Sequence, residues 1–188
     1  MLGEEVRVKK TEISDLFTIE TCPISDKRGS LTRLFCEDVL STVMDSRKVV
    51  HINKTVTKKV GAIRGLHFQY PPLAEMKFIQ CSKGKVWDVV VDLRKNSPDF
   101  LSWHAEELTA LDGRILVVPE GFAHGFQVLE PYSELLYFHT APYNPLFQGG
   151  VRFDDGSLKI SWPLEVTDIS ESDMSWESLG LNFEGVSL

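Results

Sequence analysis

Short apolar runs, rich in β-branched and aromatic residues, follow one another through the middle of the chain and constrain its fold more than any other feature. The clearest of them are residues 49–52, 78–81, 86–91, 115–118 and 135–138. Turn-forming residues such as Gly84, Asp112-Gly113 and Asn144-Pro145 separate these runs, which is typical of strands joined by tight connections. Many short strands at near-even spacing predict an all-β sandwich or barrel, with a double-stranded β-helix, or jelly roll, as the natural candidate.

A helical period is weak almost everywhere in the sequence. The two exceptions are residues 37–44 and 170–179, so short helices are expected near both ends of the chain. No internal repeat, low-complexity tract or linker interrupts the 188 residues. This length suits one domain of generous size, and we predict a single domain over residues 1–188.

The composition indicates an ordinary folded protein, with 43% apolar and 25% charged residues. No apolar run approaches the roughly 20 residues that cross a bilayer. The N-terminal Met1-Leu-Gly-Glu-Glu carries carboxylates where a secretory signal carries Lys or Arg. Cys22, Cys36 and Cys81 are widely spaced and form no Cys-x-x-Cys pair, which predicts free thiols. We therefore expect a cytoplasmic protein without a membrane partner.

The net charge of −7 is unevenly distributed along the chain. Residues 150–188 hold eight acidic and two basic residues, whereas residues 46–74 hold six Lys and Arg and no carboxylate. An acidic protein is a poor candidate for binding nucleic acid. The basic stretch fits a small anionic ligand such as a phosphate, and on charge alone a solvated basic face fits it equally well.

Two histidines lie in glycine-containing segments that suit a site for chemistry, Arg64-Gly-Leu-His67-Phe-Gln69 and Pro119-Glu-Gly-Phe-Ala-His124-Gly-Phe126. Strict alternation along a strand would place Arg64 on the face opposite to His67. A histidine that faces a barrel interior near Lys and Arg is a candidate proton carrier at neutral pH. The alternative is a core or loop histidine whose ring is hydrogen-bonded.

A metal site is the alternative to proton transfer, because cupin-type jelly rolls bind metals with several His and a Glu from two strand motifs. Gln69 stands where the first motif needs a second histidine, although Pro119-x-Gly-x-x-His124 matches the second motif and Glu75 could contribute. One histidine from each motif is a thin ligand set for a transition metal. No metal and no other cofactor is therefore expected.

Asp88 and Asp92 lie four residues apart within one apolar run and therefore point to the same face of a strand. A carboxylate inside such a strand needs a partner, which is a histidine or an arginine in many proteins. Asp88 orienting His124 is one such pairing, and an ordinary ion pair or turn role is the alternative.

Three further residues suit proton transfer or charge stabilisation. Lys77 follows His67 by ten residues, so a hairpin would bring them together, and a lysine inside a barrel can stabilise an oxyanion. By its local sequence, Tyr137 is more often a packed aromatic than a chemical group. Asp173 either belongs to the first turn of a helix capped by Ser170 or orients a histidine, and spacing alone does not choose.

Taken together, these segments resemble the dTDP-4-dehydrorhamnose 3,5-epimerases of the cupin superfamily over residues 26 to 173, most of the chain. The motifs that carry the resemblance are Asp26-Lys-Arg-Gly29, Arg64-Gly-Leu-His-Phe-Gln69, Gly84-Lys-Val-Trp-Asp-Val-Val-Val-Asp92, Leu93-Arg94, Ser97-Pro98, Pro119-Glu-Gly-Phe-Ala-His-Gly-Phe126, Tyr137, Tyr143-Asn-Pro145 and Trp162-Pro163. So many segments in the same order make this a specific signal.

The resemblance implies a homodimeric, metal-free, cupin-like jelly roll. It implies inversion of the centres beside the keto group of a nucleotide-linked 4-keto-6-deoxyhexose. His67 would be the general base, Asp173 its orienting partner, Lys77 the stabiliser of the enolate and Tyr137 the acid on the opposite face of the sugar. A carbonyl at carbon 4 acidifies the hydrogens at carbons 3 and 5, so a base, an acid and a cation are the groups that this chemistry needs.

Substrate-binding residues are implied in the same way. Arg64, together with Arg28 from the partner subunit, would hold the diphosphate, for which a guanidinium is well shaped. Asp88 with His124 resembles a second Asp–His pair of the family. Gln69 and Tyr143 complete the residues expected at the substrate, with the two departures described next.

Several positions depart from the family pattern. Arg33 stands where the family has a Glu near the pyrimidine base, and His51 where a Gln is common. Pro142 and Phe138 replace a usual aromatic and a usual Lys. Cytosine presents a bare ring nitrogen that an arginine can meet, whereas thymine and uracil present an N–H. The nucleotide could therefore be CDP in place of dTDP, unless Arg33 turns outward.

Three classes of function remain open from the sequence. The first is a nucleotide-sugar 3,5-epimerase, or a relative that inverts one centre. The second is a metal-dependent cupin oxygenase or isomerase using His67, His124, Gln69 and Glu75. The third is a sugar-nucleotide binding module without turnover, which would have no use for a proton relay. The full set of base, acid and cation favours the first.

Overall fold

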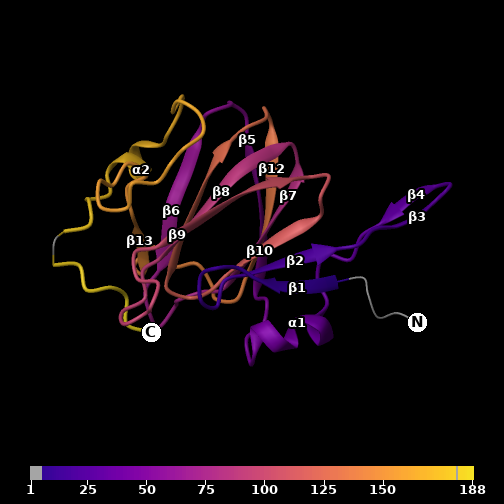
Figure 1. Ribbon diagram of the computed structural model, residues 1–188, viewed down its shortest axis with the longest axis horizontal. Coiled ribbons are helices and arrows are strands. Elements are labelled where there is room, and N and C mark those ends of the chain that lie inside the picture. Colours follow the sequence, from indigo (N-terminus) through magenta and orange to yellow (C-terminus); the bar gives the residue numbers. More distant parts are fainter. Residues whose placement is uncertain (1–5, 181) are drawn as a thin grey trace.

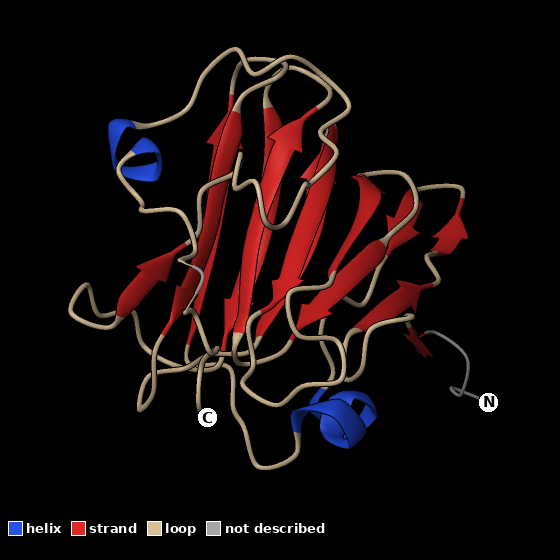
Figure 2. Cartoon of the chain, turned by 60° about the vertical axis from the view of Figure 1, so that its left-hand side comes forward, coloured by secondary structure: helices blue, strands red, loops and turns tan. Residues whose placement is uncertain are grey.

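Two antiparallel sheets facing each other form the body of the protein in the computed structural model, which describes residues 6–180 and 182–188 (Figure 1, Figure 2). The six-stranded sheet has the order β1 (Val6–Lys10), β2 (Phe17–Thr21), β10 (Arg114–Val118), β7 (Lys77–Lys83), β12 (Ser133–His139) and β5 (His51–Thr57). The five-stranded sheet has the order β13 (Gln148–Gly150), β6 (Ile63–Gln69), β11 (Phe122–Val128), β8 (Lys85–Asp92) and β9 (Trp103–Thr109). Consecutive strands repeatedly cross between the sheets, as the predicted jelly roll requires.

Four of the five apolar runs noted in the sequence lie within β7, β8, β10 and β12. The run at residues 49–52 was placed too early, because β5 begins only at His51 and continues to Thr57. Strands that carry few β-branched residues were not predicted from the sequence. β11 is the clearest case, since its histidine and glycine give a weak strand signal although all seven of its residues are buried.

Two short helices flank the sheets at opposite ends of the molecule (Figure 2). Helix α1 spans Glu37–Met44, as expected, and buries Leu40 and Met44. Helix α2 is shorter than expected, a single turn over Glu171–Met174, in which Ser170 Oγ accepts a hydrogen bond from the Asp173 N–H. Among the described residues, no helix is long and apolar enough to cross a membrane.

The core between the sheets is made of side chains that alternate along the facing strands. Ile79, Val90, Leu116, Phe126 and Leu135 are all buried there. Burying one such side chain contributes about 1.5–3 kcal/mol. Charged and polar side chains are also buried on these inner faces, and because they are rarely buried without a partner or a purpose, they locate the site.

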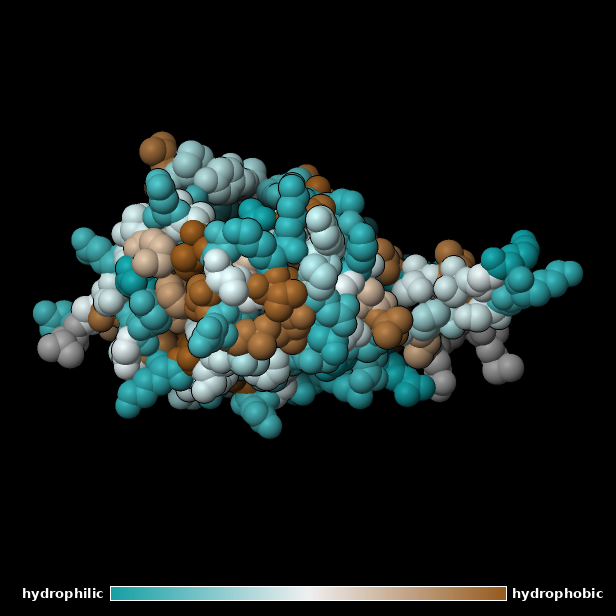
Figure 3. Space-filling view, turned by 90° about the horizontal axis from the view of Figure 1, so that it is seen from above, coloured by the Kyte–Doolittle hydropathy of each residue, from teal (hydrophilic) through white to brown (hydrophobic). Residues whose placement is uncertain are grey.

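A two-stranded arm projects from the body beyond the six-stranded sheet (Figure 1, Figure 3). It consists of β3 (Ile24–Asp26) and β4 (Gly29–Leu31). Ile24 and Leu31 pair across it and are 54% and 72% exposed. At its tip Arg28 forms an exposed ion pair of 2.6 Å with Asp26. Figure 3 shows a hydrophilic tip at the end of this projection.

Candidate active site

A cavity of about 240 Å³ opens between the sheets, and both sheets contribute to it. A second, adjoining cavity of about 490 Å³ shares Arg64, His67, Tyr143 and Gln148 with the first, so the two form one continuous cleft. The predicted site residues that line the first cavity are Arg64, His67, Gln69, Lys77, His124, Tyr137 and Tyr143. Asp173 lines the second.

Arg64 and His67 share this cleft because β6 carries one extra residue relative to β11. His124 pairs with His67 and Phe126 with Arg64, so β6 advances three residues while β11 advances two. The expectation that strict alternation separates Arg64 from His67 was therefore wrong. Gly65 makes the arrangement feasible, since its φ is +117° and a Cβ there would lie 2.5 Å from Gly125 Cα.

His67 is held by Asp173. The two side chains meet at 2.7 Å between Nε2 and Oδ1, and Asp173 Oδ2 accepts the Gly65 N–H at 3.1 Å. Burial by itself raises the pKa of Asp173, but the hydrogen bond and charge of His67 outweigh it and hold that pKa below its ordinary value. Because a carboxylate only accepts hydrogen bonds, the second ring nitrogen of neutral His67 retains a lone pair that can take a proton.

His124 forms a second pair with Asp88, one strand away from His67. Its Nε2 lies 2.9 Å from both Asp88 oxygens, and both side chains are buried. Burial raises the pKa of Asp88, and the charge of His124 opposes this rise only in part. The pairing inferred from the sequence is present, and the His124 ring packs edge-on against Tyr137 at 5.9 Å.

Tyr137 faces the cleft from β12, in the sheet opposite to the one that carries His67. It is 7% exposed. Burial, followed by the negative charge of Asp88, raises the pKa of its phenol above the ordinary value. The phenol therefore keeps its proton at neutral pH and is available as a donor.

Lys77 approaches His67 across the gap between the sheets. Its Nζ donates to the His67 carbonyl at 3.1 Å and lies 3.2 Å from Glu75 Oε1. The sequence correctly brought the two residues together but for the wrong reason, because β6 and β7 belong to different sheets and form no hairpin. The Lys77 side chain is 8% exposed, so its charge acts in a setting that water screens poorly.

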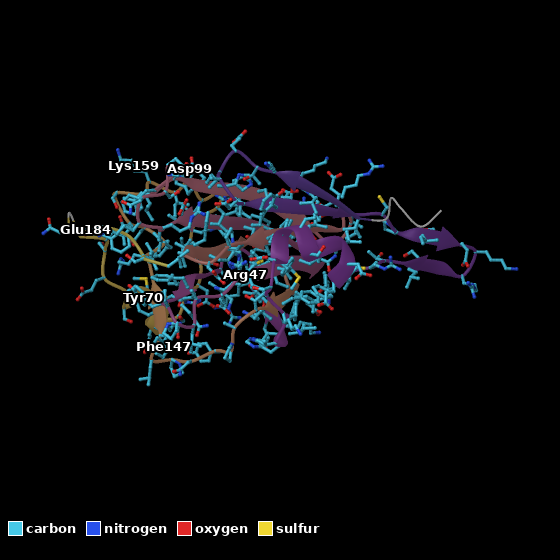
Figure 4. The ribbon with its side chains drawn as sticks, turned by 90° about the horizontal axis from the view of Figure 1, so that it is seen from below. Arg47, Tyr70, Asp99, Phe147, Lys159 and Glu184 are labelled. Atoms are coloured by element: carbon cyan, nitrogen blue, oxygen red, sulfur yellow. The ribbon has the colours of Figure 1, made fainter. Side chains whose placement is uncertain are left out.

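Gln69 lines the cleft, but its amide group is engaged by the loops at the cleft's edge. It donates to the carbonyls of Leu73 and Pro142 and accepts from the Asn144 N–H. A backbone hydrogen bond of 2.8 Å, from the Tyr70 N–H to the Phe147 carbonyl, also joins these loops. Both residues are labelled in Figure 4. Gln69 thus shapes the cleft.

Other predicted site residues lie outside the cavity lining. Arg28 is on the arm, Arg33 is exposed in the segment that follows it, and His51 stacks behind His139. The four candidate metal ligands have other partners or roles, and the described residues contain no group of three or more His, Cys, Asp or Glu side chains that could hold a metal. All three cysteines are free.

His139 was not among the residues predicted from the sequence, and Glu75 was predicted only as a possible metal ligand. Both line the cavity beside Lys77, as do Asn53 and Thr55. A signal was present, because His139 is two residues beyond Tyr137 on the same strand and must share its face. The alternation of side chains along this strand, counted from Tyr137, predicts that His139 also faces the site.

Solved structures share this architecture. A dTDP-4-dehydrorhamnose 3,5-epimerase from Bacillus anthracis, with TDP and PPi bound, has a TM-score of 0.89 at 37% identity and covers 93% of this chain and 99% of that one. A Legionella pneumophila enzyme in complex with dTDP-4-keto-L-rhamnose has a TM-score of 0.88 at 31% identity, with 94% of each chain covered. The fold is a cupin-type jelly roll, and the prediction from the sequence is confirmed.

The family follows from the sequence comparisons. The profile of dTDP-4-dehydrorhamnose 3,5-epimerases matches residues 10–180. The Shigella flexneri dTDP-4-dehydrorhamnose 3,5-epimerase is 37% identical over 171 residues, which cover 90% of this chain and 94% of that protein. The chain belongs to the dTDP-4-dehydrorhamnose 3,5-epimerase family. The resemblance and the assignment to an isomerase-class enzyme are thereby confirmed.

Proposed function

We propose that the protein inverts carbon 3, carbon 5 or both in a nucleotide-linked 4-keto-6-deoxyhexose such as dTDP-4-dehydro-6-deoxyglucose. Inversion of both centres of that sugar gives dTDP-4-dehydrorhamnose. One observation carries this proposal: His67 and Tyr137 line the same cavity from opposite sheets, and Lys77 lies beside His67. Inversion needs a base and an acid on opposite faces of the sugar, and this placement supports such a pair. Related enzymes bind TDP and a dTDP-linked keto sugar.

The reaction proceeds through an enolate. His67 takes the proton from the carbon beside the carbonyl, and the electron pair of the C–H bond moves to make the oxygen at carbon 4 an enolate. The Lys77 ammonium stabilises that charge. As the carbonyl re-forms, Tyr137 gives its proton to the same carbon from the other face. Each positioned proton-transfer group contributes about 10²–10⁴-fold to the rate.

Arg64 and Tyr143 lie where the two cavities join, so we assign them to the nucleotide end of the substrate. Arg64 meets the diphosphate, for which its planar set of donors is suited. The sugar then points toward His67 and Lys77 in the smaller cavity. Gln148, which accepts from the Tyr143 hydroxyl at 2.7 Å, holds that ring at the junction.

We further propose a homodimer in which the arm reaches the partner subunit and brings Arg28 to its diphosphate. The exposed Ile24 and Leu31 support this, since an isolated two-stranded arm is marginally stable in water and gains from covering its apolar residues. Three free cysteines support a cytoplasmic location. Sedimentation of the purified protein tests the dimer, and a monomer at micromolar concentration would exclude it.

Incubation of the enzyme with dTDP-4-keto-6-deoxyglucose in heavy water, followed by NMR, tests the reaction. Deuterium at carbons 3 and 5 with net inversion is the result expected of a 3,5-epimerase. Exchange at one carbon alone identifies a single-centre epimerase. Absence of exchange from both this substrate and its CDP-linked analogue overturns the proposed function.

A further inference from the structure

A third histidine–carboxylate pair lies in the cavity, next to Lys77. Glu75 Oε2 is 2.8 Å from His139 Nδ1, and Glu75 Oε1 is 3.2 Å from Lys77 Nζ. The side chains of Glu75, His139 and Lys77 are 7%, 12% and 8% exposed. Both carboxylate oxygens of Glu75 therefore have charged or polar partners in a nearly enclosed setting.

Sheet register explains why these groups meet. Lys77 on β7 pairs with His139 on β12, which pairs in turn with His51 on β5, so three side chains share one face on adjacent strands. The His51 ring stacks on that of His139 at 4.3 Å, and the Tyr137 ring lies 5.9 Å from it in a stacked arrangement. Stacked against both rings and hydrogen-bonded to Glu75, the His139 ring has little freedom to turn.

The contacts of the Lys77 ammonium leave one of its N–H donors free for the cavity. An ammonium carries three N–H donors and no acceptor. One donor goes to the His67 carbonyl at 3.1 Å, and Glu75 Oε1 faces the ammonium as its ion-pair partner at 3.2 Å. The third is left for the cavity that all three side chains line. The hydrogen bond to His67 and the ion pair with Glu75 together fix the ammonium, so the position of Glu75 governs where this donor points.

The charge on Glu75 is sustained by the same contacts. Burial acts to raise the pKa of its carboxyl, but the hydrogen bond from His139 and the charge of Lys77 outweigh it and hold that pKa below the ordinary value. Burial, and next the charge of His139, lowers the pKa of His51. His51 therefore acts as a neutral packing surface for His139 at neutral pH.

We propose that Glu75 and His139 are positioning residues for Lys77: His139 holds Glu75, and Glu75 aims the lysine ammonium at the enolate oxygen. This inference rests on the proposed epimerase function and extends it beyond the base, the acid and the cation. Side chains that orient metal ligands account for about 10–100-fold of activity or affinity, and we expect an effect of that order for the orientation of Lys77.

The test compares Glu75→Gln, His139→Leu and His139→Asn with the parent enzyme. Glutamine keeps the shape of Glu75 but removes its charge, leucine removes the ring N–H of His139, and asparagine restores an N–H donor close to the Nδ1 position. His104→Asn is the matched control, since His104 lies 3.8 Å from Glu106 on β9 and does not line the cavity. The measurements are kcat, KM and the affinity for dTDP.

The expected result is a kcat at least tenfold lower in Glu75→Gln and His139→Leu, with KM and dTDP affinity within twofold of the parent. His139→Asn should recover most of the lost kcat, and His104→Asn should leave it unchanged. A kcat within twofold of the parent in both Glu75→Gln and His139→Leu overturns the inference. So does a His139→Asn variant no better than His139→Leu.

A second measurement is independent of turnover. Lysine Nζ protons held by a hydrogen bond and a buried ion pair exchange slowly, so NMR of ¹⁵N-labelled protein should show a Lys77 Nζ resonance, assigned by its loss in Lys77→Arg. It should disappear in Glu75→Gln and persist in His139→Asn. Its persistence in Glu75→Gln overturns the inference, even if the parent enzyme is active. A parent enzyme inactive on every substrate refutes the proposed function, and this resonance still decides whether Glu75 positions Lys77.

Discussion

The Nε2 atom of His67 and the Oδ1 atom of Asp173 lie 2.7 Å apart although 106 residues of chain separate them. Helix α2 presents Asp173 to β6 through its capped first turn, and the same carboxylate accepts the Gly65 N–H. One buried carboxylate therefore orients the proposed base and anchors the C-terminal segment. Changes here are expected to affect both activity and stability.

Replacing His67 by alanine should reduce turnover by about 10²–10⁴-fold, because the base that removes the proton is lost. Nucleotide binding should survive, since Arg64 and Tyr143 remain in place. Turnover by NMR and dTDP affinity by calorimetry check both halves. Retained turnover would show that another group is the base.

Replacing Tyr137 by phenylalanine keeps the buried ring but removes the proton donor. His67 can still remove the substrate proton and return a solvent-derived one from the same face. Deuterium should therefore enter the sugar in heavy water while net inversion falls by about 10²-fold or more. Inversion at the parent rate in this variant would contradict the role given to Tyr137.

Acid should destabilise the parent protein through Asp173. Because the folded-state pKa of Asp173 is held below its ordinary value of about 3.9, its stabilisation is complete above that pH. It is lost as the pH falls through the folded-state value. Asp173→Asn should cost about 1–3 kcal/mol in the free energy of unfolding at pH 7 and should flatten its decline below about pH 4.

Urea unfolding between pH 3 and pH 7 measures this effect. Asp168→Asn is the matched control, because Asp168 forms an exposed ion pair with Lys59 at 3.0 Å. Such a pair contributes about 0–1 kcal/mol, so the control should resemble the parent at every pH. Equal acid sensitivity in Asp173→Asn and the parent would contradict the prediction.

Nucleotide preference tests the hypothesis attached to Arg33. The proposed function expects dTDP to bind more tightly than CDP, in keeping with the exposed position of Arg33 outside the cavity lining. If this guanidinium instead met a bare ring nitrogen, CDP would bind more tightly than dTDP or UDP, and Arg33→Glu would reverse that order. Arg33→Gln provides an uncharged comparison. Calorimetric titration of the three nucleotides measures the preference, and a clear preference of the parent for dTDP would rule out the CDP hypothesis.

Gly65→Ala should destabilise the fold by about 1–3 kcal/mol or more. Its φ is +117°, and the added Cβ would lie 2.5 Å from Gly125 Cα and 2.7 Å from the His124 carbonyl oxygen. Gly156→Ala is the control, because no atom lies within 4 Å of its added Cβ. Thermal unfolding compares the two, and a Gly65→Ala midpoint matching that of Gly156→Ala would refute the prediction.

Local sequence was enough to find most of the strands and most of the proposed chemical groups. Runs such as residues 86–91 combine β-branched residues with flanking turns, so their strand character follows from short-range preferences. The short motif Arg64-Gly-Leu-His67-Phe-Gln69 likewise indicated a functional site from local sequence alone. The extra residue in β6 left no such mark, since a bulge depends on how two strands pair and not on either strand alone.

By itself, the sequence determined the all-β class and the family, and it pointed to His67, Lys77, Tyr137 and Asp173 as the proposed chemical groups. Only the tertiary structure decided how these residues are combined. It placed Lys77 across the sheets from His67, brought Asp173 to His67 and set Glu75 and His139 beside the lysine. The physical reason is that side-chain alternation is local, whereas the choice of which strands face each other is made by the packing of the whole core.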